Sequence, residues 1–340
     1  MTIDFLLNWH TPIALLPVVA FLTALILFDS FKLVSFKLIL GVIAIGALMA
    51  GASFLANTAA YTHMDIEFVS FSRYVSPWIE EFLKGLTVVY FVRSRRVGLL
   101  VDAVIIGFAL GAGFALVENV FYLAERSQAV LLVQLIRGFG TAVMHGGTTG
   151  LFAMVSVALY DRRPNSGLII FLPGFLFAVM VHSAFNHLLV QPVLATVVML
   201  IVLPGALYFA FKHSEKGLRD WMESDLDAKI NLLKAINSGQ FLATPAGVYL
   251  QTLRDRFSGE NLVDLFCYLR LHGELALRAK GLLLMREAGF EDLPLDDQTR
   301  SSLAELGQLE RALGKTALLA LRPIMAVTGK DIWQVKLFQS

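Results

Sequence analysis

Seven runs of mostly apolar residues dominate the sequence, and each is long enough to form a helix that crosses a lipid bilayer. Such a helix needs roughly 20 apolar residues to span the hydrocarbon core. Because lipid offers the backbone no hydrogen-bond partners, runs of this length must fold as helices. We therefore predict an all-α, polytopic membrane helix bundle of about seven spans, at residues 12–28, 38–60, 75–92, 99–123, 138–159, 168–190 and 193–211.

Charge is unevenly distributed along the chain. Only 16% of the residues are charged, against about 25% in an average soluble protein. Residues 1–212 hold 12 Lys/Arg and 10 Asp/Glu, whereas 213–340 hold 16 and 17. This contrast predicts two domains, a transmembrane bundle over 1–212 and a cytoplasmic, soluble helical domain over 213–340. The net charge of +1 argues against a nucleic-acid partner.

The C-terminal domain shows helical periodicity in three amphipathic segments, at about 215–236, 259–289 and 296–321. It has no alternating strand pattern and no catalytic spacing of Ser, His and Asp. Its single cysteine, Cys267, excludes a disulfide framework within the chain. Regulation, partner docking and oligomerisation all stay open as its role, and the oligomeric state is not predicted.

The basic residues of the loops predict the orientation of the bundle. Clusters of Lys and Arg follow the first, third, fifth and seventh runs, and the alternate loops carry few. The positive-inside rule then places the N-terminus outside and the C-terminal domain in the cytoplasm. The stretch "SQAVLLVQLIRGFG" at 127–140 is either the lead-in to the fifth run or an interfacial helix that ends near Arg137, and we favour the interfacial helix.

Strongly polar residues inside the apolar runs are few, and they gather at one depth. A charge at the bilayer centre costs roughly 2.5–3.5 kcal/mol on insertion scales, so each is a candidate for function. In the predicted orientation they lie roughly 8–12 Å below the outer surface. The group comprises Glu80, Glu81 and Lys84 in "WIEEFLKGL", and Glu118, His145, His182 and Asn186 on three later runs.

Helical spacing brings several of these side chains within reach of one another. Lys84 follows Glu80 by four residues and Glu81 by three, so its amine can reach either carboxylate. His182 and Asn186 share a face of their helix in the same way. Paired carboxylates suit general acid–base chemistry, and an imidazole with an amide can hold an oxyanion. The residue types therefore favour cleavage of an acyl bond by water.

Four motifs in order, "EEFLK", "FALVEN", "MHGG" and "HSAFN", make residues 75–190 resemble the PrsW family of intramembrane proteases. That family is related to the CAAX-processing and Abi-type membrane peptidases, where a histidine stands in place of Glu118. The resemblance implies cleavage of membrane proteins, for some members anti-sigma factors during envelope stress. It also implies a location in the bacterial cell (inner) membrane, with the lipid bilayer and a single-span membrane protein as partners.

The predicted mechanism is hydrolysis by a water molecule that one glutamate of the pair activates. The expected catalytic residues are Glu80, Glu81, His145, His182 and Asn186, with Lys84 and Glu118 in supporting roles that set the protonation of the pair. No cofactor is expected, because the sequence has no H-E-x-x-H motif and no local pair of ligands. The alternative is zinc, held by His145, His182, Glu81 and Glu118.

Two other functions fit buried ionisable residues in membrane helices. A proton- or cation-coupled transporter also places Glu, Lys and His at depth, although the sequence shows no inverted repeat. A signalling or haem-binding protein would use His145 and His182 on neighbouring spans as axial ligands. Ion-dependent flux would indicate the first, and the colour of the purified protein would indicate the second.

Overall fold

In a computed structural model, the described part of the chain is helical and contains no strand. It comprises residues 34–94, 96–125, 131–162, 166–187, 226–288 and 296–325, with residue 290 and scattered positions between 19 and 23 and between 197 and 212. The chain divides into two compact units, Met1–Ser214 and Glu215–Ser340. Each unit is described by itself below.

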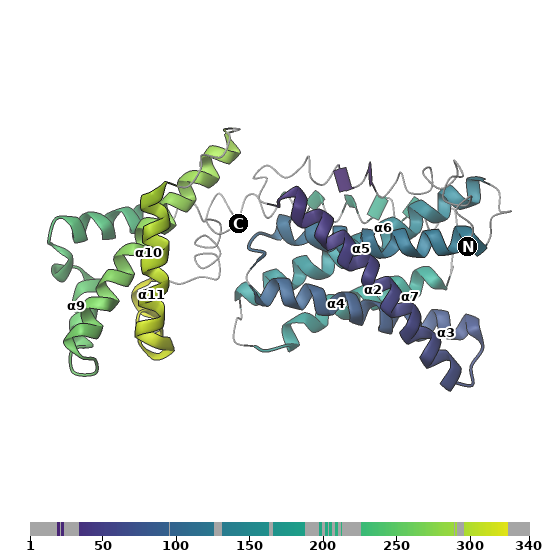
Figure 1. The fold of residues 1–340 in the computed structure, drawn as a ribbon, viewed down its shortest axis with the longest axis horizontal. Coiled ribbons are helices and arrows are strands. Elements are labelled where there is room, and N and C mark those ends of the chain that lie inside the picture. Colours follow the sequence, from purple (N-terminus) through teal and green to yellow (C-terminus); the bar gives the residue numbers. More distant parts are fainter. Residues whose placement is uncertain are drawn as a thin grey trace. The chain divides into compact units, whose positions relative to one another are not determined.

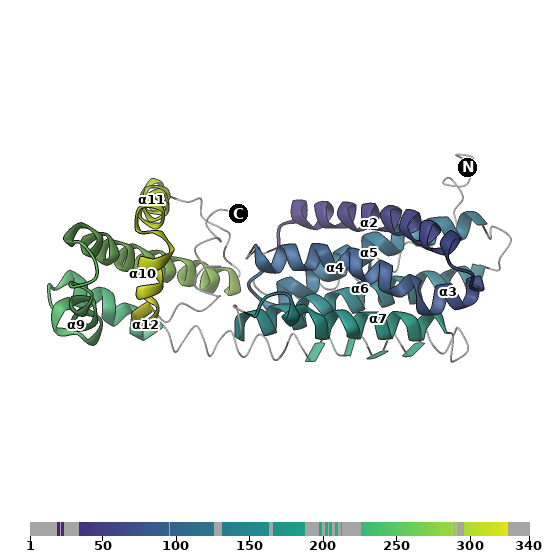
Figure 2. The ribbon, with the colours of Figure 1, turned by 90° about the horizontal axis from the view of Figure 1, so that it is seen from below.

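The first unit is a bundle in which two long helices form the centre. Helix α2 lies along one side and α7 along the other, with α5 and α6 between them (Figure 2). Helix α2 crosses the other helices obliquely (Figure 1) and packs mainly on α5. The elements are α2 (Phe36–His63), α3 (Phe68–Tyr74), α4 (Ser76–Arg93), α5 (Leu100–Glu125), α6 (Leu131–Arg162), the 3-10 turn η2 (Ile169–Phe171) and α7 (Leu172–Asn186).

Four helices of this unit are long and apolar enough to cross a membrane: Phe36–His63, Leu100–Phe121, Gly138–Arg162 and Ile169–Asn186. These correspond to four of the seven predicted spans. Helix α4 has 18 residues, yet its charged side chains separate it from these four by composition. The predicted runs at 12–28 and 193–211 lie mostly outside the described residues, which cover only scattered positions of each.

The prediction of a separate interfacial helix ending near Arg137 is wrong. Helix α6 runs without interruption from Leu131 to Arg162. Gly138 and Gly140, which follow Arg137, lie within it. Glycine in a helix costs only about 1 kcal/mol relative to alanine, which packing against neighbouring helices can offset.

Small residues let α5 and α6 approach each other closely. A Cβ atom added to Gly111 would lie 2.1 Å from the carbonyl oxygen of His145, and one added to Gly107 would lie 2.6 Å from that of Thr149. Backbones come this close only where a residue has no side chain. This close contact between α5 and α6, the α5–α6 seam, therefore fixes the position of His145 along α6 relative to α5.

The second unit is a small helical bundle with its own apolar core. A helix over residues 226–237 ends before Gly239, whose positive φ of 73° suits the end of a helix. The buried side chains of α10 and α11, such as Leu269, Leu275 and Leu313, form most of the core. The other elements are η3 (Phe241–Ala243), α9 (Pro245–Thr252), α10 (Gly259–Glu287), α11 (Asp297–Ala320) and α12 (Arg322–Met325).

Candidate active site

Helix α4 turns its charged face into the bundle rather than toward lipid. Pro77 lies in the first turn, where its missing N–H costs nothing, and the glutamates follow one turn later. Glu81 and Lys84 are fully buried, whereas Trp78, Phe82 and Leu86 on the opposite face are exposed. The apolar face of α4 thus suits lipid, and its polar face lies against α6 and α7.

Glu81 is the centre of the buried cluster. Its Oε1 accepts a hydrogen bond from Lys84 Nζ at 2.6 Å and another from His182 Nδ1 at 2.8 Å. Because the carboxylate can only accept, Nδ1 of His182 carries the ring proton. The lone pair of His182 is therefore on Nε2, the nitrogen that faces away from Glu81.

Lys84 links this carboxylate to a second histidine. Its Nζ lies 2.9 Å from His145 Nδ1, and His145 Nε2 lies 2.7 Å from Glu118 Oε2. Lys84 also lies over the ring of Phe114, with Nζ 4.8 Å from its centroid. His145 is fully buried, but 37% of the Glu118 side chain is exposed. Glu118 is therefore the accessible end of the network.

Glu80 lies at the other end of the network, where its two oxygens have different surroundings. Oε1 accepts hydrogen bonds from Ser76 Oγ at 2.6 Å and from Asn57 Nδ2 at 3.1 Å. Oε2 lies 3.8 Å from His182 Nε2. Oε2 is buried and has no hydrogen-bond partner within the described residues.

Six of the seven predicted site residues thus lie in one network, and two further residues join it. Asn57 and Ser76 were not predicted, although an amide inside an apolar helix and a serine one turn before Glu80 were visible signals. Asn186 is placed differently from the other six, because its Nδ2 donates to the carbonyl oxygen of Ser72 at 2.9 Å. That bond ties the end of α7 to α3.

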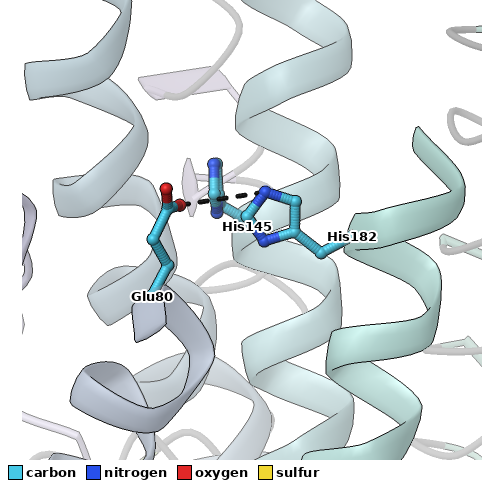
Figure 3. Close-up of side chains that lie close together, drawn as sticks. All are labelled: Glu80, His145 and His182. Carbon is cyan, nitrogen blue, oxygen red and sulfur yellow. Dashed lines mark ion pairs between the residues drawn. The ribbon is translucent and has the colours of Figure 1, made fainter. Parts of the chain in front are cut away.

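Three members of the network form a group that could hold a metal ion. Glu80, His145 and His182 each offer a ligand atom, and these atoms lie within 4.8 Å of one another. Their side chains converge from α4, α6 and α7 (Figure 3). Two imidazoles and one carboxylate are a donor set that catalytic zinc sites use. The bare lone pair of His182 Nε2 and the unsatisfied Oε2 of Glu80 fit such an ion.

A helical membrane bundle with a buried carboxylate–histidine cluster fits a membrane-embedded hydrolase. The chain belongs to the PrsW family of intramembrane metalloproteases, whose sequence model matches residues 34–210. The match runs from α2 through α7, so it includes every residue of the network. Neither the curated proteins nor the solved structures gave a match. The protein is therefore an integral membrane peptidase, as the four motifs predicted.

The prediction that no cofactor is needed is wrong. The family is one of metalloproteases. The structure also brings one ligand atom each of Glu80, His145 and His182 to within 4.8 Å of one another. The sequence argument looked for two ligands on one helix, whereas here each ligand comes from a different helix. The zinc alternative named both histidines, but it chose Glu81 and Glu118 where the group contains Glu80.

Proposed function

We propose that this protease hydrolyses peptide bonds of membrane proteins with a divalent metal, zinc by its donor set, held by Glu80, His145 and His182. One observation carries the proposal: three ligand atoms from three helices converge, and the carboxylate oxygen among them has no hydrogen-bond partner in the described structure. A buried polar atom without a partner is costly unless something else binds it. A metal ion would satisfy Oε2 of Glu80.

A metal at this position supplies Lewis acidity to a carbonyl group and makes water a stronger acid. The rest of the chemistry falls to the side chains around it. Glu81 fixes the tautomer of His182 through Nδ1, which keeps Nε2 for the ligand role. Lys84 compensates the charge of Glu81. His145 accepts from Lys84 at Nδ1 and donates to Glu118 at Nε2, so a metal bound at Nδ1 would replace the bond to Lys84.

We assign the acid–base role to Glu118. Its Oε2 accepts a hydrogen bond from His145 Nε2 at 2.7 Å, and its side chain is the most exposed of the cluster. A carboxylate in this position takes a proton from the attacking water and returns it to the leaving amine. Asn186, bonded to the carbonyl of Ser72, then keeps α7 and His182 in place rather than contacting the oxyanion.

We further propose that the substrates are single-span membrane proteins, with anti-sigma factors as one class. A helical substrate hides its amides in its own hydrogen bonds, so the cleaved segment must unwind before hydrolysis. The family supports membrane substrates, and the basic loops support an orientation with the C-terminal domain in the cytoplasm. The membrane that we propose is the bacterial inner membrane, as the resemblance implies. Phosphatase and fluorescent-protein fusions at the C-terminus test that orientation.

The metal content of two matched histidine variants tests the central proposal. His182→Asn removes a ligand, whereas His187→Asn removes a histidine five residues along the same chain that contacts Tyr74 and the carbonyl of Ser183. Mass spectrometry of the purified full-length chain should find zinc in the wild type and in His187→Asn, but not in His182→Asn. Equal zinc content in all three proteins would contradict the assignment of His182 as a ligand.

The cleavage of substrates needs its own test. Terminal peptides of membrane proteins are compared by mass spectrometry between cells carrying the wild type and cells carrying Glu80→Gln at matched expression. New termini in or beside a membrane segment that vanish in Glu80→Gln would support proteolysis at this site and identify the substrate. Identical termini under several envelope stresses would contradict it.

A further inference from the structure

Asn57 on α2 and Ser76 at the start of α4 hold one oxygen of Glu80. Ser76 Oγ donates to Glu80 Oε1 at 2.6 Å, and Asn57 Nδ2 donates to the same oxygen at 3.1 Å. Asn57 Nδ2 also donates to Ser76 Oγ at 2.9 Å. The three side chains form a closed triangle of hydrogen bonds between two helices.

We propose that Asn57 is a positioning residue that aims the ligand Glu80 from across the helix interface. Because both donors converge on Oε1, the carboxylate cannot rotate freely about its last bond. Oε2 then stays 3.8 Å from His182 Nε2, buried and without a hydrogen-bond partner in the described structure. Anchoring one oxygen and leaving the other bare is what a ligand carboxylate requires from its surroundings. This inference rests on the proposed function.

A purely structural role for Asn57 would look different. Polar side chains often join membrane helices through one hydrogen bond, and the bond from Asn57 to Ser76 alone would join α2 to α4. The additional bond to Glu80 joins the same two helices, and it also restricts the carboxylate. His182 is arranged in the same way, because Glu81 accepts the hydrogen bond from Nδ1 and leaves Nε2 for a metal.

The chain offers a matched control for the test. Asn57→Leu removes both polar atoms with little change in volume. Thr58→Val is an isosteric change at the next position, where the hydroxyl of Thr58 donates only to the carbonyl of Phe54 within its own helix, at an exposed site. Ser76→Ala removes a single hydroxyl and serves as a second test if Asn57→Leu does not fold.

The first readout is the affinity of each full-length protein for Zn²⁺ in nanodiscs, measured by competition with a chromogenic chelator. Loss of an outer partner of a metal ligand typically weakens metal binding 10–100-fold. We expect a loss of about that size for Asn57→Leu, a smaller or similar loss for Ser76→Ala, and none for Thr58→Val. Affinities of Asn57→Leu and Ser76→Ala that equal that of Thr58→Val would overturn the positioning role, while leaving the metal assignment intact.

A wild type that binds no Zn²⁺ would instead refute the metal assignment. The steady-state cleavage of a membrane reporter then decides the positioning role separately. A lower kcat at unchanged KM in Asn57→Leu would still support a role of Asn57 in positioning Glu80, because the unchanged KM means that substrate binding is intact. An unchanged kcat would overturn it.

Discussion

Replacing Gly111 by alanine should disable the site from a position that contacts no substrate. Gly111 is on α5 and faces the backbone of α6 where His145 begins its reach into the cluster. An added Cβ would lie 2.1 Å from the carbonyl oxygen of His145 and 2.8 Å from the Cα of Gly146. The first distance is about 1.3 Å short of the 3.4 Å at which ordinary contact begins. Both neighbours are backbone atoms, so α6 itself must move.

The size of the effect follows from that displacement. Overpacking of this kind costs about 1–3 kcal/mol of stability, which a bundle with a large core can tolerate. A misplacement of about 1 Å in a catalytic constellation, however, can cost about 10²-fold in rate. We therefore expect Gly111→Ala to remain folded, to cleave about a hundredfold more slowly, and to bind zinc less tightly.

Two other glycines separate local displacement from general destabilisation. Gly51→Ala changes a helical glycine of α2 with no atom within 4 Å of the added Cβ, so it should be neutral or slightly stabilising. Gly113→Ala places a Cβ 2.1 Å from the carbonyl oxygen of Ile43, on the seam between α5 and α2. It should cost similar stability but less activity, because that seam does not carry His145 and lies 14 residues, about 21 Å, along α2 from Asn57.

The assay is the rate of reporter cleavage in proteoliposomes, divided by the amount of folded protein from size-exclusion chromatography. Gly111→Ala should fall well below Gly113→Ala, which should fall below or equal Gly51→Ala. If Gly111→Ala is as active as Gly51→Ala, or if Gly113→Ala loses as much activity as Gly111→Ala, the α5–α6 seam does not set the position of His145.

Two further predictions concern a buried and an exposed carboxylate. Lys84→Met leaves the buried charge of Glu81 without its partner and should lower the free energy of unfolding by about 3–5 kcal/mol, measured by unfolding in mixed detergent. Adding Glu81→Leu should restore stability but not cleavage activity. Recovery of both would refute the role of the pair. Hydrogen bonds from Thr299, and then Arg278, lower the pKa of Asp296 at the start of α11. At pH values above the ordinary pKa of 3.8, the ionised carboxylate therefore stabilises the folded state. This stabilisation is lost as the pH falls through the lowered pKa. Asp296→Ala should accelerate hydrogen exchange in the first turn of α11 at pH 6, and the difference from wild type should shrink at low pH.

The membrane helices could be predicted because apolar length and helical spacing are properties of a single segment. The four spans recognised in the structure follow directly from runs of apolar residues. The reach of Lys84 to Glu81 likewise follows from a separation of three residues on one helix, and the structure confirms it. The continuity of α6 did not follow, because where the helix of this span begins depends on its packing against other helices.

The division of labour within the site could not be read from the sequence, because it depends on contacts between helices. Glu80 and Glu81 are neighbours in the chain, yet they point about 100° apart and meet different partners. One faces Asn57 and Ser76, and the other faces Lys84 and the Nδ1 atom of His182. No periodicity distinguishes the two glutamates before α2, α6 and α7 are packed around them.

The charges of the network favour a divalent metal ion, as its geometry does. Glu81 and Lys84 neutralise each other at 2.6 Å, and in the proposed site the two histidines would be neutral ligands. Glu80 and Glu118 are then the remaining charged members, and together they carry two negative charges when ionised. Net charge inside a membrane protein is expensive unless it is compensated. A divalent cation between Glu80, His145 and His182 would bring the sum to zero with both glutamates ionised, whereas without a cation protons on these groups would have to offset the charge.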